Sequence, residues 1–195
     1  MKKQRSIDII RFLPSLFRYA DVAKCTGYPN VFLTRAIAMG YVIRVMRGAY
    51  LNMFKTAPGI EEVACYLRAP AYISCEWALH YHHIILQAPS VCTTITLSTS
   101  VGNRYKVNYK GTVIEYSKLS DKLFFGFESH EGFNLAYPEK ALLDVVYLRK
   151  KIPFQDELEI KPLDMNRLNK FAAIFPKTIQ RIMKKGINFS FPEQN

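Results

Sequence analysis

The sequence predicts an α+β fold in two domains, and the order of its periodic segments is the reason. Two short helical patterns come first and are followed by β-branched or aromatic runs at 41–43 and 49–51. A second set of strand-like runs fills 93–135, and helical patterns continue from Pro138 onward. The chain has 195 residues, of which 49% are hydrophobic and 13% aromatic, so it can form a real core and is not a disordered protein.

The helical pair near the amino terminus has the spacing of a helix-turn-helix. A short helix ends near Cys25, and a second helix is predicted over 30–39. Leu33, Ala36 and Ile37 recur in that second helix at the three- and four-residue spacing of a buried face. We therefore expect these three side chains to anchor the helix to a small core.

A β-hairpin is expected directly after the second helix. The runs 41–43 and 49–51 have strand propensity, and the segment 44–48 between them is predicted to form a tip that carries two arginines. Two helices followed by a two-stranded wing predict a winged helix-turn-helix over 1–58. The natural ligand of that motif is duplex DNA.

The distribution of charge supports this interpretation. Residues 1–58 carry ten Lys or Arg against two Asp, a net charge of +8, which leaves +3 of the total +11 for the rest of the chain. Lysine and arginine neutralise phosphates and release counterions, so a concentrated positive charge favours a nucleic-acid partner. We expect the second helix to face the groove and the wing arginines to contact the backbone or minor groove. The predicted DNA-contacting residues are Lys24, Asn30, Thr34, Arg35, Arg44 and Arg47.

The second domain is expected to begin after Pro58 and to span 59–195, with a mixed architecture. Helices are predicted at 61–67 and 74–83, the latter capped by Ser74. The strand-like runs that follow, which are expected to form an antiparallel-rich sheet, are 93–97, 105–109, 112–116, 123–127 and 133–135.

Helices close the second domain. Pro138 suits the first position of a helix, and Glu139 lies at that helix's positive end. The apolar stripe expected to bury this helix is Ala141, Leu142, Val145 and Leu148. Amphipathic helices at 165–175 and 178–185 are expected to pack against the sheet. The basic run Lys177, Arg181, Lys184 and Lys185 is interpreted as a solvated face, with contact to nucleic acid as the alternative.

Cysteine and histidine residues do not have the spacing of a metal or catalytic site. His80 and His83 share a helical face, but Cys75 lies on a different face and no further ligand follows at a suitable spacing. We expect no metal, no cofactor and no enzymatic activity. The four cysteines form no CxxC pair, and the start of the chain has no long apolar segment. These features predict reduced thiols, no signal peptide, no membrane span and a cytoplasmic location.

Three segments resemble one known family. Segment 40–50 contains a glycine, an apolar run, an arginine and then Arg-Gly-x-Tyr, and segment 72–82 combines Tyr-Ile-Ser with Trp-Ala-Leu and ends on a histidine. Segment 136–144 contains Pro-Glu-Lys-Ala-Leu-Leu-Asp and is the most distinctive of the three. These segments resemble motifs of the AbiEi family of antitoxins from type IV toxin-antitoxin and abortive-infection systems. The candidate antitoxin-domain residues are Ser74, His82, Glu139, Lys140 and Asp144.

The resemblance implies a transcriptional autorepressor and antitoxin. It implies that an amino-terminal winged helix binds the operator upstream of its own operon, as a homodimer if that operator is palindromic. It implies that the second domain opposes a nucleotidyltransferase-type toxin. Type IV systems need no stable complex between the two proteins.

Two other functions stay open. One is a metal-dependent nuclease-like enzyme. The predicted strands lack, however, the pattern in which one acidic residue is closely followed by a second acidic residue that lies two positions before a lysine. The available acids are Glu115, Asp121, Glu128, Glu139 and Asp144. The other is a protein-interaction module in which the winged helix is a scaffold and 138–144 docks a partner. The apolar residues of that segment are interpreted as core, which leaves Glu139, Lys140 and Asp144 to meet a partner or to support the fold.

Overall fold

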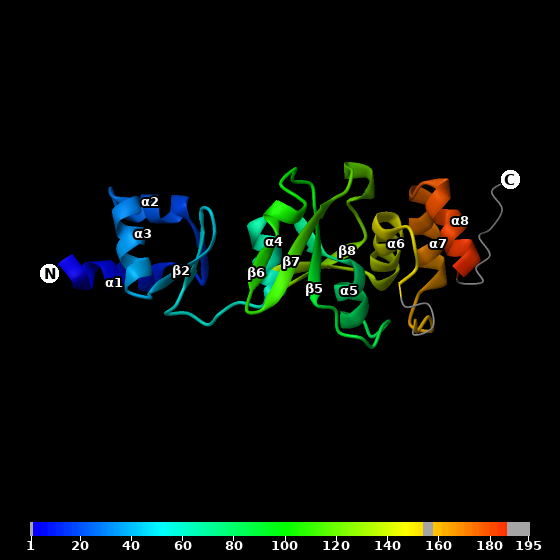
Figure 1. The fold of residues 1–195 in the computed structure, drawn as a ribbon, viewed down its shortest axis with the longest axis horizontal. Coiled ribbons are helices and arrows are strands. Elements are labelled where there is room, and N and C mark those ends of the chain that lie inside the picture. Colours follow the sequence, from blue (N-terminus) through cyan, green and yellow to red (C-terminus); the bar gives the residue numbers. More distant parts are fainter. Residues whose placement is uncertain (1, 154–157, 187–195) are drawn as a thin grey trace. The chain divides into compact units, whose positions relative to one another are not determined.

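The chain forms an α+β protein with two compact units. The computed structural model describes residues 2–153 and 158–186 (Figure 1). Unit 1 is Met1–Val63 and unit 2 is Ala64–Asn195. The boundary was predicted after Pro58, whereas the division falls within helix α4 (Ile60–Leu67).

The described part of unit 1 combines helices with a small antiparallel sheet. Its elements are α1 (Lys2–Phe12), β1 (Leu16–Arg18), α2 (Tyr19–Cys25), α3 (Pro29–Ala38), β2 (Val42–Met46) and β3 (Ala49–Asn52). The strand order is β1-β3-β2, and both pairings are antiparallel. Leu51 in the central strand lies opposite Leu16 on one side and Ile43 on the other.

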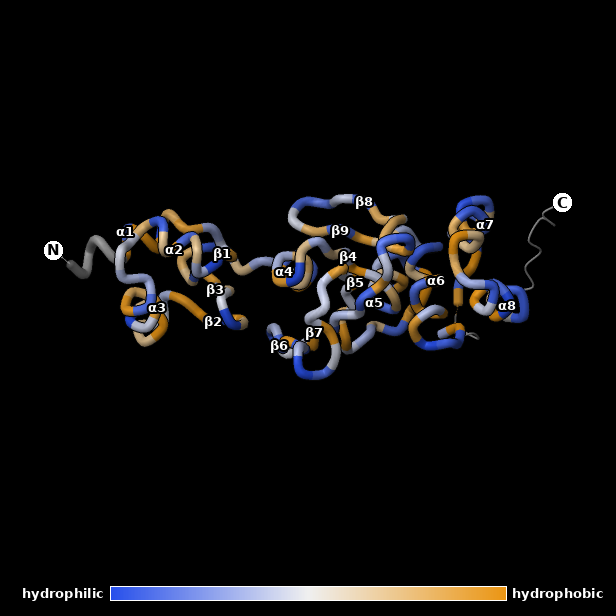
Figure 2. The backbone as a smooth tube through the Cα atoms, turned by 90° about the horizontal axis from the view of Figure 1, so that it is seen from above, coloured by the Kyte–Doolittle hydropathy of each residue, from blue (hydrophilic) through white to orange (hydrophobic). Residues whose placement is uncertain are grey.

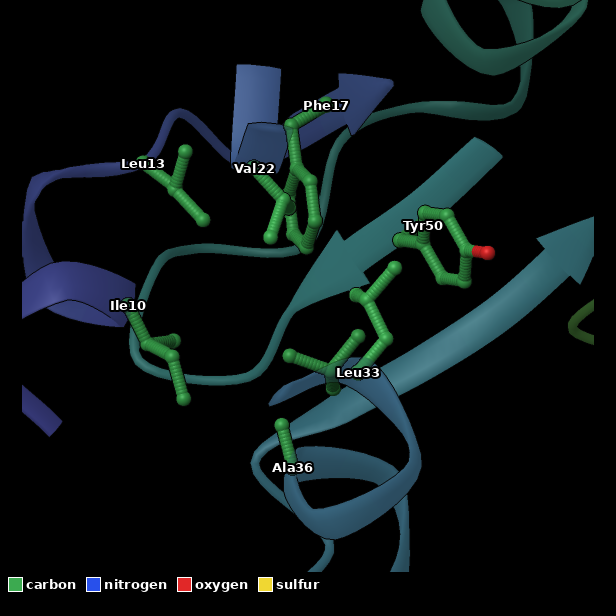
Figure 3. Close-up of a cluster of buried hydrophobic side chains, with 8 residues drawn as sticks. Ile10, Leu13, Phe17, Val22, Leu33, Ala36 and Tyr50 are labelled. Atoms are coloured by element: carbon green, nitrogen blue, oxygen red, sulfur yellow. The ribbon is translucent and has the colours of Figure 1, made fainter. Parts of the chain in front are cut away.

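One hydrophobic cluster holds these elements together (Figure 3). Its side chains come from each helix and from the strands, and they are Ile10, Leu13, Phe17, Val22, Leu33, Ala36, Val42 and Tyr50. Ile37 was predicted to join Leu33 and Ala36 in the core, and this was wrong, because 39% of it is exposed. Only a narrow face of α3 meets the cluster, and Ile37 lies at the rim of a hollow between α3 and the hairpin.

A buried asparagine ties the sheet to the first helix. Asn52 is 2% exposed, and its Nδ2 donates to the carbonyl oxygens of Ile10 at 2.7 Å and Leu13 at 2.8 Å. Its Oδ1 accepts from the backbone N–H of Phe54 at 3.0 Å. Each polar atom of the side chain therefore has a partner, as burial requires.

The described part of unit 2 is built around a six-stranded sheet. The elements that follow α4 are β4 (Ala71–Ile73), α5 (Cys75–Tyr81), β5 (Val91–Thr96), β6 (Val107–Tyr109), β7 (Thr112–Lys118), β8 (Phe127–His130), β9 (Phe133–Ala136), α6 (Pro138–Arg149), α7 (Met165–Ile174) and α8 (Lys177–Gly186). The strand order is β6-β7-β5-β4-β9-β8. The pairs β6–β7, β4–β5 and β8–β9 are antiparallel, whereas β5–β7 and β4–β9 are parallel, so the sheet is mixed.

Of two predicted strands, 105–109 begins later than the sequence indicated, and 123–127 was wrong, because β8 shares only Phe127 with it. The runs 105–109 and 123–127 each start in a single 3-10 turn, and extended pairing begins only at Val107 and Phe127. Gly126 has a φ of 73°, a left-handed conformation that interrupts extended backbone just before β8. The β-branched and aromatic composition of these runs could not reveal that break.

Helix α6 lies inside unit 2, between the sheet with α5 and the helices α7 and α8 (Figure 1). The sequence predicted a single buried stripe on this helix. The structure shows that all residues from Glu139 to Val146 are buried, because neighbours cover the helix on opposite sides. None of the helices in the described ranges has both the length and the apolar composition needed to cross a bilayer.

Candidate functional site

A hollow in unit 1 brings together side chains of α3 and of the β2–β3 hairpin. It has a volume of about 460 Å³. Asn30, Thr34, Arg44 and Arg47, four of the six predicted DNA-contacting residues, line it. All four are exposed at the surface.

The hairpin places Arg44 differently from the prediction and Arg47 in the turn, as predicted. Arg44 was expected at the tip, but it lies within β2 opposite Tyr50, and its Nε donates to the carbonyl of Met46 at 3.4 Å. Arg47 lies in the turn beside Gly48, whose φ of 80° permits the tight reversal. The Gly48 carbonyl accepts the backbone N–H of Tyr19 at 3.1 Å, which attaches the turn to the start of α2.

The polar groups of the hollow are open to a ligand. Thr34 Oγ1 donates to the carbonyl of Asn30 at 2.9 Å, which leaves the lone pairs of the hydroxyl to accept. Within the described ranges, none of the salt bridges includes Arg44 or Arg47. The hollow thus presents two guanidinium cations, one hydroxyl and one side-chain amide from a single concave surface.

Arg35 and Lys24 do not line this hollow. Arg35 follows Thr34 directly, so it points about 100° away around the helix, and it lines a larger hollow of about 960 Å³ that includes Ile10 and Tyr28. Lys24 has a side chain that is 78% exposed and pairs with Asp21 at 3.7 Å. The six predicted residues therefore divide between different faces of unit 1.

Tyr19 and Tyr50, which were not among the predicted DNA-contacting residues, also line the hollow. Tyr50 closes the Arg-Gly-x-Tyr motif, which was a usable signal. Tyr19 lies in a region whose helix start was not evident, because no capping side chain precedes it. The actual cap is the Asp21 carboxylate, which accepts the Arg18 backbone N–H at 2.8 Å.

A second constellation is the buried polar cluster of unit 2, formed by Tyr72, Ser74, Lys140 and Asp144. Asp144 Oδ2 accepts from Ser74 Oγ at 2.7 Å and from Tyr72 Oη at 3.0 Å. Lys140 Nζ donates to Tyr72 Oη at 2.8 Å and forms an ion pair with Asp144 Oδ1. Its ammonium also lies 5.2 Å from the ring centroids of Tyr72, Phe125 and Phe175.

Burial dominates the electrostatics of this cluster. It lowers the pKa of Lys140 and raises the pKa of Asp144, while the attraction between the two charges acts in the opposite direction on each. Burial and the neighbouring Asp144 raise the pKa of Tyr72 far above its ordinary value, and burial raises the pKa of the adjacent Cys75 thiol. The tyrosine and the thiol are therefore neutral at physiological pH.

The motif residues of unit 2 act within the fold. Glu139, Lys140 and Asp144 were predicted to be free to meet a partner or to support the fold, and their exposure of 1%, 0% and 0% shows that only the second option holds. Ser74 occupies the predicted N-cap position of α5, but its hydroxyl donates to Asp144 and makes no capping hydrogen bond to the helix.

Glu139 and His82 fasten other segments. Glu139 Oε1 accepts the backbone N–H of Asp164 at 2.7 Å, and its Oε2 lies 3.5 Å from the guanidinium of Arg167. His82 Nε2 lies 2.8 Å from the carbonyl oxygen of Ala136 and must donate, because a carbonyl only accepts. These contacts anchor α7 and β9.

The described residues contain no group of three or more His, Cys, Asp or Glu side chains placed to hold a metal ion. Of the acids considered for a nuclease, Asp144 and Glu139 are engaged as described above, and Glu115 pairs with Lys106 at 3.4 Å.

The comparisons with known proteins show a similar fold and do not show a family. No family model matches the chain, and no curated protein matches it. The chain is similar to the crystal structure of the RV2827C protein from Mycobacterium tuberculosis, with a TM-score of 0.61. The two sequences are 9% identical, and the match covers 94% of this chain and 74% of that chain. Identity this low means that the likeness concerns the arrangement of elements alone.

Proposed function

We propose that the chain is a DNA-binding transcriptional autorepressor and antitoxin of a type IV toxin-antitoxin system. In this proposal unit 1 is a winged helix-turn-helix, with α2 and α3 as the helix pair and β2–β3 as the wing. The observation that carries the proposal is the hollow in which Asn30 and Thr34 of α3 face Arg44 and Arg47 of the hairpin.

The composition of the hollow suits the backbone and groove edges of a duplex. Arginine neutralises phosphates and donates in a planar fork, while asparagine and threonine accept and donate toward base edges. We assign α3 to the major groove and the two arginines to phosphates or an adjacent minor groove. Arg35 and Lys24, which lie on other faces, are assigned peripheral roles.

The antitoxin role rests on the resemblance of segments 72–82 and 136–144 to the AbiEi family. The buried cluster gives those segments a physical task, because it joins α6 to the β4–α5 region and thereby supports the surface of unit 2. We propose a nucleotidyltransferase-type toxin as the functional partner, opposed in the cytoplasm without a stable complex.

The DNA-binding part is tested by fluorescence anisotropy. The whole chain is titrated into labelled DNA from upstream of its own gene and into a scrambled duplex, at two salt concentrations. The variant Arg47→Ala is expected to weaken binding and to lower the salt slope by about 1, as loss of one phosphate contact requires. The matched control is Arg35→Ala, an exposed arginine of the same unit, which is expected to change affinity less. Equal affinity for both duplexes, or unchanged binding by an Arg44→Ala, Arg47→Ala double variant, overturns this part.

The antitoxin part is tested separately by growth rescue. The chain is co-expressed with a nucleotidyltransferase-type toxin encoded in its operon. The double variant at Arg44 and Arg47 is expected to restore growth as well as the unaltered chain while it fails to repress a reporter. Continued growth arrest in the presence of the unaltered chain removes the antitoxin role.

A further inference from the structure

Helix α8 carries a basic face on unit 2, distant in sequence from the hollow described above. Its exposed cations are Lys177, Arg181, Lys184 and Lys185. At about 100° per residue they fall within an arc of about 100° on the helix surface. Ile179 and Met183, which are both 0% exposed, lie on the opposite side.

The basic face is not neutralised within its own helix. The sequence of α8 contains no acidic residue. None of the salt bridges in the part of the chain that the structure describes includes Lys177, Arg181 or Lys185. Lys177 and Lys184 are separated by two helical turns, about 10 Å along the axis. Such a row of cations fits a linear polyanion.

The burial of the apolar side excludes insertion into a lipid surface. An amphipathic helix that binds membranes uses its apolar face to enter the acyl region. In α8 the buried part of that face, Ile179 and Met183, packs against α6 and α7, and the exposed charged side chains are all cations. The tube through α8 is largely hydrophilic in Figure 2.

The composition of α8 also argues against single-stranded nucleic acid. Recognition of single strands depends on aromatic side chains that stack on bases, and α8 contains no aromatic residue. The phosphates of a duplex can be bound by cations without aromatic side chains. We infer that the basic face of α8 is a second DNA-contacting surface, which binds the phosphate backbone without sequence preference. The choice of DNA over duplex RNA rests on the proposed function of unit 1.

A second surface changes how tightly the whole chain holds DNA. Once one unit is bound, the other searches a small volume, so a weak contact contributes well beyond its separate affinity. The α8 surface therefore raises affinity for every duplex equally and leaves the preference for upstream DNA to unit 1.

The test uses the full chain and a scrambled duplex at about 50 and 200 mM salt. The variant combines Lys177→Gln, Arg181→Gln and Lys185→Gln. Its matched control combines Lys110→Gln, Lys118→Gln and Lys122→Gln, three exposed lysines of the same unit with the same charge change. The α8 variant is expected to bind at least about tenfold more weakly at low salt and to lower the salt slope by about 2 to 3, because each phosphate contact contributes about 0.9.

If the α8 variant and its control lose affinity for the duplex equally, the inference is overturned, since the loss is then an effect of net charge alone. A charge-preserving variant, Lys177→Arg, Arg181→Lys and Lys185→Arg, is expected to bind as the unaltered chain does. Failure of this variant to bind while it keeps the native circular dichroism spectrum and melting temperature also overturns the inference. If the α8 variant loses affinity for duplex RNA but keeps its affinity for duplex DNA, the assignment to DNA is overturned.

The same titrations separate this inference from the proposed function. If the unaltered chain shows no preference for upstream DNA, yet the α8 variant alone loses affinity for the scrambled duplex, the α8 surface stands and autorepression falls. If the preference is present and the α8 variant matches its control, the α8 surface falls and autorepression stands.

Discussion

Lys140 and Asp144 form an ion pair one helical turn apart, and both side chains are completely buried. Removing two charges from water costs several kcal/mol for each ion, and their attraction alone seldom offsets that cost. In this protein the hydroxyls of Ser74 and Tyr72 add hydrogen bonds to the carboxylate and to the ammonium. The pair is therefore stable only as part of the whole cluster.

Replacing one member of this pair is expected to destabilise unit 2 strongly. Lys140→Met leaves an uncompensated carboxylate in the core, and we expect the free energy of unfolding to fall by about 3–5 kcal/mol in urea titrations. The double variant Lys140→Met, Asp144→Leu is expected to lose less than the sum of the two single losses. Lys122→Met, at an exposed position, is the control and is expected to have little effect. Additive losses in the double variant would show that the pair is not coupled.

Asn52 is expected to be essential for the stability of unit 1. Asn52→Ala leaves two carbonyl oxygens and one N–H without their partner, at about 1 kcal/mol or more for each buried group. We therefore expect a loss of about 2–4 kcal/mol, measured by chemical unfolding. The control Asn103→Ala changes an exposed asparagine of unit 2. If both variants unfold at the same denaturant concentration, the hydrogen bonds of Asn52 do not stabilise the fold.

A side chain at Gly126 is expected to destabilise unit 2. A Cβ at this position would lie 3.1 Å from Lys140 Cγ and 3.1 Å from Phe171 Cε2, in a backbone with a φ of 73°. Gly111 has a φ of 86° with nothing within 4 Å, so Gly111→Ala isolates the backbone strain. We expect Gly126→Ala to cost about 1–3 kcal/mol more than Gly111→Ala, because crowding adds to strain. Equal melting temperatures for the two variants would contradict the crowding.

Asp164 is expected to make the stability of α7 depend on pH. Its carboxylate accepts the backbone N–H groups of Arg167 and Asn166, and these hydrogen bonds lower its pKa below the ordinary value of 3.8. The stabilisation is present above pH 3.8 and is lost as the pH falls through the lowered pKa. Asp164→Asn keeps a capping oxygen without the titration, so the melting temperature of the unaltered chain should fall more steeply below that pH. If the melting temperatures of the two proteins fall in parallel as the pH is lowered, the protonation of Asp164 is not coupled to stability.

Local sequence was sufficient for features that depend on near neighbours. The helix with Pro138 at its first position, the 165–175 helix and the 112–116 strand all appear within a few residues of the predicted bounds. Periodicity and capping are properties of a single segment, which is why they can be found before the fold is known. The AbiEi-like motif at 136–144 was visible for the same reason.

Tertiary structure alone decided what those residues do. Thr34 and Arg35 are adjacent in sequence but line different hollows, because the core fixes the rotation of α3. The charges of α6 suggested an exposed face, yet helices packed on opposite sides bury Lys140 and Asp144 together with Tyr72, which lies 68 residues before Lys140 in sequence. Burial, strand order and the pairing of distant charges depend on contacts between remote segments, and no local pattern contains them.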